Sequence, residues 1–435
     1  MSGGSGSDTP PGPVRLRSGA FRPAPRQGVR VSTSASTLAF VESPVQLLNV
    51  LEWAYARAAA PGRPLDGVPS QRARRAGRAA RKEPGPRPAG ALAPVRIVVL
   101  PPTDPMSRGQ LRRMAALARD EGCEVRWQEA RGSRLAPLKA LAALAGDVRA
   151  ARTVVVGDPF SRYVQLLLTL VRAEELVVVD DGTATMEFAA QTARGERLVR
   201  WHRVGGGGLP GRVRELAYAP DSAAARRRFV PDRAVAAAGA GPGSGPESGP
   251  GKARRVEVFT SMPVTPHGGM TLRPNEFAWT RARFGPPRLT RGTDLVGTSL
   301  VETGVVDPER YLDAVRSLTL EHGATRYFAH RRESPEKLRA LSRATGLEIV
   351  RPDLPLELIA RRGPVGRTIL SFPSTVVHTL PYALTGTGVT VAVCDVDPSW
   401  LTGSASPRAR SFLAGVTDTA RDVHRLPAQA APTAG

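Results

Sequence analysis

The sequence predicts an α/β protein of two Rossmann-like domains, and three observations carry this prediction. Segments rich in valine and isoleucine alternate with segments of helical periodicity along most of the 435 residues. The apolar runs are continuous, as at 153–159, which is typical of parallel strands buried on both faces. A stretch of glycine, proline and serine at 236–255 divides the ordered chain into two halves of comparable size.

The first half begins with a strand that leads directly into a helix. Ser43 is expected to be the N-cap of that helix and Pro44 its first residue, and Ser107 is expected to cap the second helix. The expected strands of this half are 36–43, 95–101, 123–130, 153–159 and 175–182, and the helices are 44–58, 107–122 and 161–173.

The second half repeats the alternation. Ligands of such folds bind beyond the carboxyl ends of the parallel strands, so we expect the chemistry at strand ends. The expected strands are 254–262, 294–300, 325–333, 347–352, 367–375 and 389–397, and the helices are 307–323 and 334–346.

Composition sets the expected domain boundaries, because segments without large apolar residues cannot offset the entropy of ordering. The expected organisation is a disordered tail at 1–35, an N-terminal domain at 36–235 with a basic loop at 61–90, a flexible linker at 236–255, a C-terminal domain at 256–420 and a disordered tail at 421–435.

The chain is strongly basic, with 61 Lys plus Arg against 39 Asp plus Glu and a formal charge of +22. This charge suits an anionic partner such as a nucleotide or a membrane surface. Arginine, alanine, glycine and proline are all heavily used while lysine is scarce, which is typical of a coding bias rather than of one designed patch. We therefore expect no nucleic-acid partner.

Cysteine use and hydropathy bear on the compartment. Cys123 and Cys394 are the two cysteines, and they support neither a disulfide framework nor a cysteine metal site. No run reaches the roughly 20 apolar residues of a membrane span, and the N-terminus lacks the apolar core of a secretory signal. We expect a cytoplasmic protein, with peripheral contact to an anionic membrane face as an option for the basic loop.

An acidic pair ends the strand at 175–182. Asp180, Asp181 and Gly182 follow three valines, and adjacent carboxylates resist burial. One carboxylate would be enough to cap the following helix, so the pair favours a general base for an acceptor hydroxyl.

A cluster of basic residues ends the strand at 325–333. His330, Arg331 and Arg332 stand just before a helix start, where three groups able to carry positive charge suit a phosphate. Ser374 and Thr375 open a later helix, where they form either a second phosphate cradle or an ordinary cap.

Asp395 and Asp397 follow the last predicted strand with the D-x-D spacing of a metal site or of a phosphatase of the haloacid dehalogenase type. About forty residues follow, too few for the further domain that such a phosphatase needs.

His378, His267 and Glu276 are further cleft candidates, although each also fits an ordinary loop or helix position.

The sequence lacks a P-loop, a G-x-G-x-x-G after a strand, a G-x-S-x-G and a Cys/His metal cluster. What remains is a base on one half and a phosphate site on the other. This layout predicts group transfer from a nucleotide-linked donor.

These motifs, in this order, resemble those of the bacterial sialyltransferases and α-2,8-polysialyltransferases. The family has an acidic D/E-D/E-G motif, matched by Asp180–Asp181–Gly182, an H-P motif, matched by His330 and Arg331, and a Ser/Thr motif, matched by Ser374–Thr375. The segment 40–53 also looks like the family's first strand and helix. Arg331 stands where the family has proline, which keeps the histidine and adds charge.

The resemblance implies a two-domain glycosyltransferase of the B type that transfers sialic acid from CMP-sialic acid to a glycan or glycolipid acceptor with inversion. Asp180 or Asp181 would be the base in an N-terminal acceptor domain. His330 would assist departure of the nucleotide in a C-terminal donor domain, with Gly182, Arg331, Ser374 and Thr375 at the donor. It implies no metal and no cofactor. The alternative is a non-catalytic nucleotide or polyanion binder with the same two-domain shell.

Overall fold

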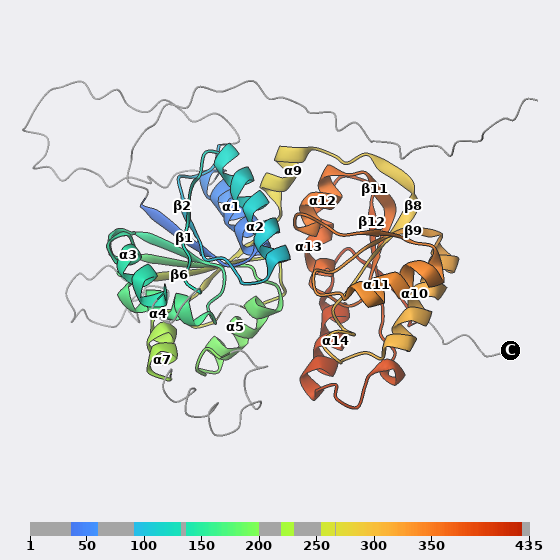
Figure 1. Ribbon diagram of the computed structural model, residues 1–435. Helices are drawn as coiled ribbons and strands as arrows, with labels where there is room; N and C mark the ends of the chain where they lie inside the picture. Colours follow the sequence, from blue (N-terminus) through green and yellow to red (C-terminus); the bar gives the residue numbers. More distant parts are fainter. Residues whose placement is uncertain are drawn as a thin grey trace, which may run out of the picture. The chain divides into compact units, whose positions relative to one another are not determined.

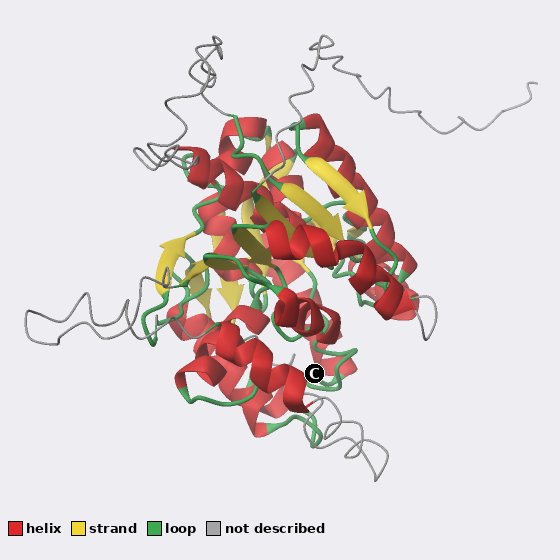
Figure 2. Cartoon of the chain, turned by 90° about the vertical axis from the view of Figure 1, so that its left-hand side faces the viewer, coloured by secondary structure: helices red, strands yellow, loops and turns green. Residues whose placement is uncertain are grey.

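The computed structural model describes residues 36–59, 91–131, 136–199, 219–229, 254–265 and 267–428. Three expected features lie outside the described residues: the whole tail at 1–35, the basic loop at 61–90 and, except for residues 254 and 255, the linker at 236–255. Figure 1 follows the chain through two groups of strands with their helices, and in Figure 2 helices lie on both sides of the strands.

The first sheet has seven parallel strands in the order β3-β2-β1-β4-β5-β6-β7. The valine-rich central strands are buried along their whole length, which explains why their apolar runs are continuous. The strands are β1 (Thr37–Val41), β2 (Arg96–Val99), β3 (Glu124–Trp127), β4 (Thr153–Val156), β5 (Glu175–Val179), β6 (Arg255–Thr260) and β7 (Thr271–Pro274). The helices of this part are α1 (Pro44–Ala59), α2 (Pro105–Asp120), α3 (Ala136–Ala150), α4 (Arg162–Leu170), α5 (Thr183–Ala193), α7 (Ala219–Arg228) and α9 (Ala278–Phe284).

The second sheet has six parallel strands in the order β10-β9-β8-β11-β12-β13. The strands are β8 (Leu289–Val296), β9 (Ala324–Phe328), β10 (Glu348–Val350), β11 (Val365–Ser371), β12 (Thr390–Cys394) and β13 (His424–Leu426). The helices are α10 (Pro308–His322), α11 (Pro335–Thr345), α12 (Leu356–Arg362), α13 (Val376–Ala383) and α14 (Pro407–Thr419), with a short 3₁₀ turn at Pro398–Trp400. The predicted fold class, two Rossmann-like parallel sheets with alternating helices, is confirmed.

The expected boundary between the halves is wrong. β6 and β7 follow the glycine-rich segment, yet β6 pairs with β5 from Glu175↔Arg255 to Val179↔Phe259, and β7 pairs with β6. The segment 236–255 therefore interrupts the first sheet instead of separating the two sheets. The glycine-, proline- and serine-rich composition of this segment does not determine which sheet the next strand joins.

Two local predictions also differ from the structure. α2 begins at Pro105, and its N-cap is Asp104, whose carboxylate accepts from the Ser107 backbone N–H at 2.7 Å; Ser107 is therefore not the cap. The tail expected at 421–435 includes β13, which pairs with β12. Ser43 does cap α1, because its hydroxyl oxygen accepts from the Gln46 backbone N–H at 3.2 Å.

Helix α9 is fixed to the first sheet by a buried carboxylate on α1. Glu52 accepts from the backbone N–H groups of Trp279 at 2.8 Å and Thr280 at 2.9 Å, which are donors of the first turn of α9. Burial raises the pKa of Glu52 to about 7, although these hydrogen bonds favour its charged form. The apolar core that packs around α1 and α9 also contains Leu358 from α12. Apolar packing therefore joins the first sheet and its helices to the second sheet and its helices, within one compact unit at 35–435.

Within the described ranges, no helix has the length and the apolarity that a membrane span requires.

Candidate active site

Asp180 lies in the turn between β5 and α5 and is 2% exposed. Its Oδ2 accepts from the backbone N–H and the hydroxyl of Ser261, both at 3.0 Å, and Ser261 follows the neighbouring strand β6. Its Oδ1 is buried and has no hydrogen-bond partner among the described residues. Burial raises the pKa of Asp180, although the hydrogen bonds from Ser261 oppose the shift.

The backbone of this turn is fixed by buried amides. Asn49 on α1 donates from its side chain to the Asp180 carbonyl at 2.9 Å, and Asn275 donates to the Asn49 side-chain oxygen, also at 2.9 Å. The Asp181 backbone N–H donates to the Thr185 hydroxyl at 2.9 Å. Asp181 is half-buried, so the two carboxylates have different environments: that of Asp180 faces the protein interior and Asp181 retains exposed surface.

Gly182 brings the acidic motif against the Ser/Thr motif. Its φ is +63°, a conformation that favours glycine, and a Cβ at this position would lie 3.0 Å from the Thr375 Cγ2. Asp180–Asp181–Gly182 and Ser374–Thr375 thus meet, although they belong to different sheets. This contact is the central feature of the candidate site.

Glu357 at the start of α12 is a carboxylate near Asp180 that the sequence analysis missed. Burial raises the pKa of Glu357, and the charge of Asp180 raises it further. The Thr379 hydroxyl donates to the Glu357 carboxylate at 2.6 Å. No local pattern identifies Glu357, because its proximity to Asp180 depends on how the two sheets pack.

His330 follows β9, and its pKa lies below the ordinary value of histidine. Burial lowers the pKa of His330 to about 4, and the positive charges of Arg331 and Arg332 lower it further, so the ring is neutral at pH 7. The Arg332 backbone N–H donates to His330 Nδ1 at 3.2 Å. A neutral imidazole that accepts at Nδ1 carries its proton on Nε2, so His330 can donate a hydrogen bond there. At neutral pH the positive charge of this cluster therefore comes from Arg331 and Arg332.

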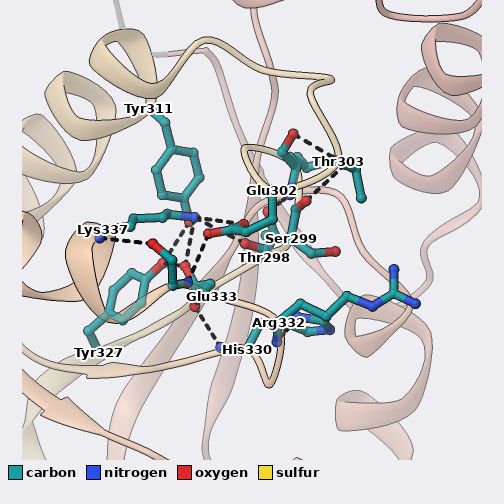
Figure 3. Close-up of polar contacts among 12 residues, drawn as sticks. Thr298, Ser299, Glu302, Thr303, Tyr311, Tyr327, His330, Arg332, Glu333 and Lys337 are labelled. Atoms are coloured by element: carbon teal, nitrogen blue, oxygen red, sulfur yellow. Dashed lines mark hydrogen bonds and ion pairs between the residues drawn. The ribbon is translucent and has the colours of Figure 1, made fainter. Parts of the chain in front are cut away.

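Glu333 is a second residue that the sequence analysis did not assign (Figure 3). Its buried carboxylate accepts from the Tyr327 hydroxyl at 2.5 Å and from the His330 backbone N–H at 2.6 Å, and it pairs with the Lys337 ammonium at 2.8 Å. The i,i+4 spacing of Glu333 and Lys337 predicts their ion pair, but the link to His330 requires the turn to be known.

Arg331 and Arg332 are exposed at the same strand end. The charge of Arg331 contributes to lowering the pKa of Asp104, after the larger effect of the hydrogen bonds from Ser107. Asp104 is the N-cap of α2, which packs on the first sheet, so the basic cluster at the end of β9 lies near the start of α2.

The Ser/Thr motif lies between β11 and α13. The Ser374 and Ser371 hydroxyls are 3.2 Å apart, and both Ser374 and Thr375 are half-buried. Thr375 occupies the N-cap position of α13 without making a side-chain cap bond, so its hydroxyl is not used for that purpose. In the second sheet β8 lies between β9 and β11. Thr298 and Ser299, which follow β8, therefore lie at the same carboxyl edge of the sheet as His330, which follows β9.

The remaining candidates have structural positions. Asp395 pairs with Arg425 at 2.8 Å, and Asp397 caps the 3₁₀ turn by accepting from the Ser399 backbone N–H at 2.7 Å. The described part of the chain contains no group of three or more His, Cys, Asp or Glu side chains arranged for a metal.

The three further cleft candidates differ in exposure. His267 and Glu276 are exposed. His378 on α13 is 5% exposed, and its buried Nε2 has no hydrogen-bond partner among the described residues. Burial lowers the pKa of His378 to about 4.

Comparison with solved structures gives distant matches. An α/β-galactoside α-2,3-sialyltransferase from Photobacterium phosphoreum matches with a TM-score of 0.44 and 8% identity, over 89% of this chain and 98% of that one. A sialyltransferase from Photobacterium damsela matches with a TM-score of 0.39 and 9% identity, over 90% and 81%. The E. coli heptosyltransferase WaaC matches with a TM-score of 0.36 and 12% identity, over 85% and 91%.

No protein-family model matches the chain, and a search among curated sequences gives no significant match. Matches at these TM-scores and identities do not assign the chain to a family. The function proposed below therefore rests on the residues of the site.

Proposed function

We propose that the protein is an inverting glycosyltransferase that moves a sugar from a nucleotide donor to a glycan or glycolipid hydroxyl, with CMP-sialic acid as the donor. The observation that carries this proposal is the contact of Gly182 with Thr375, 3.0 Å from the Gly182 Cβ position to the Thr375 methyl. This contact supports a single site to which the acidic pair and the Ser/Thr motif both contribute residues.

The chemistry needs a base on one side of the anomeric carbon and leaving-group stabilisation on the other. The acceptor oxygen attacks the anomeric carbon, its proton passes to a carboxylate, and the bond from that carbon to the phosphate oxygen breaks. We assign the base to Asp181, because it retains exposed surface while Asp180 is 2% exposed. Asp180 is then a positioning residue that links the turn to Ser261.

The departing nucleotide carries the electron pair of the broken bond on its phosphate. Neutral His330 would donate from Nε2 to that phosphate, and the hydroxyls of Ser374 and Thr375 would donate beside it. Arg331 replaces the proline of the resembling family and would add positive charge at the same edge. Hydrogen-bond donors and arginine charge would stabilise the leaving group without any step that depends on a metal.

The test is calorimetric titration of CMP, UMP, ADP and GMP into the wild type and into His330→Ala. We expect CMP to bind best and to lose most of its affinity in the variant, and CMP-sialic acid to be consumed when glycan acceptors are supplied. Equal binding of the four nucleotides would contradict the donor assignment. Tight CMP binding without sugar transfer to any acceptor would favour the non-catalytic binder instead.

A further inference from the structure

We propose that Glu333 is the positioning residue of His330: its carboxylate holds the turn at 330–333 so that the imidazole presents a proton on Nε2. For the identity of the phosphate ligand that His330 would contact, this inference rests on the proposed function. The positioning itself concerns groups within the protein and can be measured without a ligand.

The turn at 330–333 is closed from both ends. The Glu333 backbone N–H donates to the His330 carbonyl at 3.0 Å, and the His330 backbone N–H donates to Glu333 Oε2 at 2.6 Å. Between these two bonds the Arg332 backbone N–H is directed at His330 Nδ1, 3.2 Å away. The tautomer of His330 therefore depends on the turn, and the turn depends on the Glu333 carboxylate.

Every partner of the Glu333 carboxylate is a donor. Oε1 accepts from the Tyr327 hydroxyl and the Lys337 ammonium, and Oε2 accepts from the His330 backbone N–H. The Tyr311 and Tyr327 hydroxyls are 2.8 Å apart, which allows Tyr311 to donate to Tyr327 while Tyr327 donates to Glu333. A glutamine at position 333 would place its N–H₂ group against one of these donors. A carboxylate therefore fits this site, and a glutamine amide of nearly the same shape does not.

The surroundings leave the carboxylate little room to move. A Cβ on Gly297 at the end of β8 would lie 2.2 Å from Glu333 Oε2 and 2.6 Å from the Tyr327 hydroxyl. The Lys337 ammonium is itself held by the Thr298 carbonyl at 3.2 Å (Figure 3). A rigid group with fixed partners is what orientation of a neighbouring imidazole requires.

Glu302 provides a matched control. Its carboxylate also lies near the Lys337 ammonium, at 3.5 Å, and it accepts from the Ser334 backbone N–H at 3.3 Å. It makes no hydrogen bond with His330, whose backbone N–H goes to Glu333. Glu302→Gln therefore perturbs the same lysine without releasing the turn.

The experiment compares Glu333→Gln with Glu302→Gln by ¹⁵N NMR of histidine-labelled full-length protein, with His330→Ala to assign the resonance. We expect His330 of the wild type and of Glu302→Gln to show an unprotonated Nδ1. We expect Glu333→Gln to show a mixture of tautomers and to bind CMP about ten-fold more weakly. Tyr327→Phe, which removes one donor to Glu333, should give a smaller shift and serves if Glu333→Gln does not fold.

Three outcomes separate the possibilities. An unchanged His330 tautomer in both folded Glu333→Gln and Tyr327→Phe would overturn the inference. Equal effects of Glu333→Gln and Glu302→Gln would also overturn it, since the cluster would then act only through Lys337. A tautomer change confined to Glu333→Gln and Tyr327→Phe, in a protein that does not bind CMP, would support the positioning role and refute the donor assignment.

Discussion

Gly182 and Thr375 are in such close contact that a methyl group on Gly182 would lie 3.0 Å from the Thr375 methyl. Gly182→Ala should therefore abolish sugar transfer by separating the acidic turn from the Ser/Thr motif, and it should destabilise the protein by about 2 kcal/mol. The measurements are the transfer rate and the free energy of unfolding.

Gly268 supplies the control for this substitution. Its φ of +62° matches that of Gly182, but a Cβ there would meet no atom within 4 Å. Gly268→Ala should cost about 1 kcal/mol of backbone strain and leave transfer unchanged. Adding Thr375→Ser to Gly182→Ala removes the contacting methyl and should restore part of the stability. If both alanine variants behave alike, the Thr375 contact has no importance of its own.

Asp181→Asn should lower kcat by about 10² to 10⁴-fold while CMP binding stays the same, because a general base acts on the acceptor and does not hold the donor. Asp180→Asn keeps an oxygen to accept from Ser261 and should have a smaller effect. Steady-state kinetics with calorimetry checks both variants. An inactive Asp180→Asn beside an active Asp181→Asn would reverse the two roles.

Ser374→Ala should weaken CMP binding about ten- to hundred-fold, the effect of losing one hydroxyl donor to a charged phosphate. Ser406→Ala is the contrast, because the Ser406 hydroxyl caps α14 by accepting from the Ala409 backbone N–H at 3.1 Å. That variant should lose about 1 kcal/mol of stability and retain CMP affinity. Loss of stability without loss of affinity in Ser374→Ala would mean that its role is structural.

His378 should make the protein sensitive to acid. Its folded pKa of about 4 lies below the ordinary value of 6.5, so its contribution to stability is present above pH 6.5 and is lost as the pH falls toward 4. Between pH 7 and pH 5 this loss amounts to about 2 kcal/mol.

His378→Gln should remove this loss of stability, so the free energy of unfolding of the variant should fall less on acidification than that of the wild type. Urea titrations at pH 7, 6 and 5 measure the difference. Parallel curves for the two proteins would show that His378 keeps its ordinary pKa in the folded chain.

The sequence predicts what depends on neighbouring residues. Continuous valine runs identify buried parallel strands such as β4 and β5. Polar residues directly after a strand predict a candidate site at the carboxyl edge of the sheet, as at Asp180 and His330. Two local signals can compete for the start of one helix. Asp104 followed by Pro105 is a stronger start for α2 than Ser107, which lies two residues inside the helix.

What the sequence cannot supply is the identity of distant partners. β6 pairs with β5 although the paired residues are about 80 positions apart in the sequence. Glu357 lies near Asp180 because the two sheets pack together. The lowered pKa of His330 follows from its burial, which is a property of the folded chain. Each of these facts depends on contacts that no local window contains.

The membership of β6 and β7 in the first sheet has a consequence for dissecting the protein. A cut between residues 230 and 253 would leave the N-terminal fragment without Ser261, Asn275 and two of its seven strands. The two fragments should therefore fold only when expressed together, as a complementing pair. A cut near Gly285, after α9, would instead release a first fragment that contains every strand of its sheet.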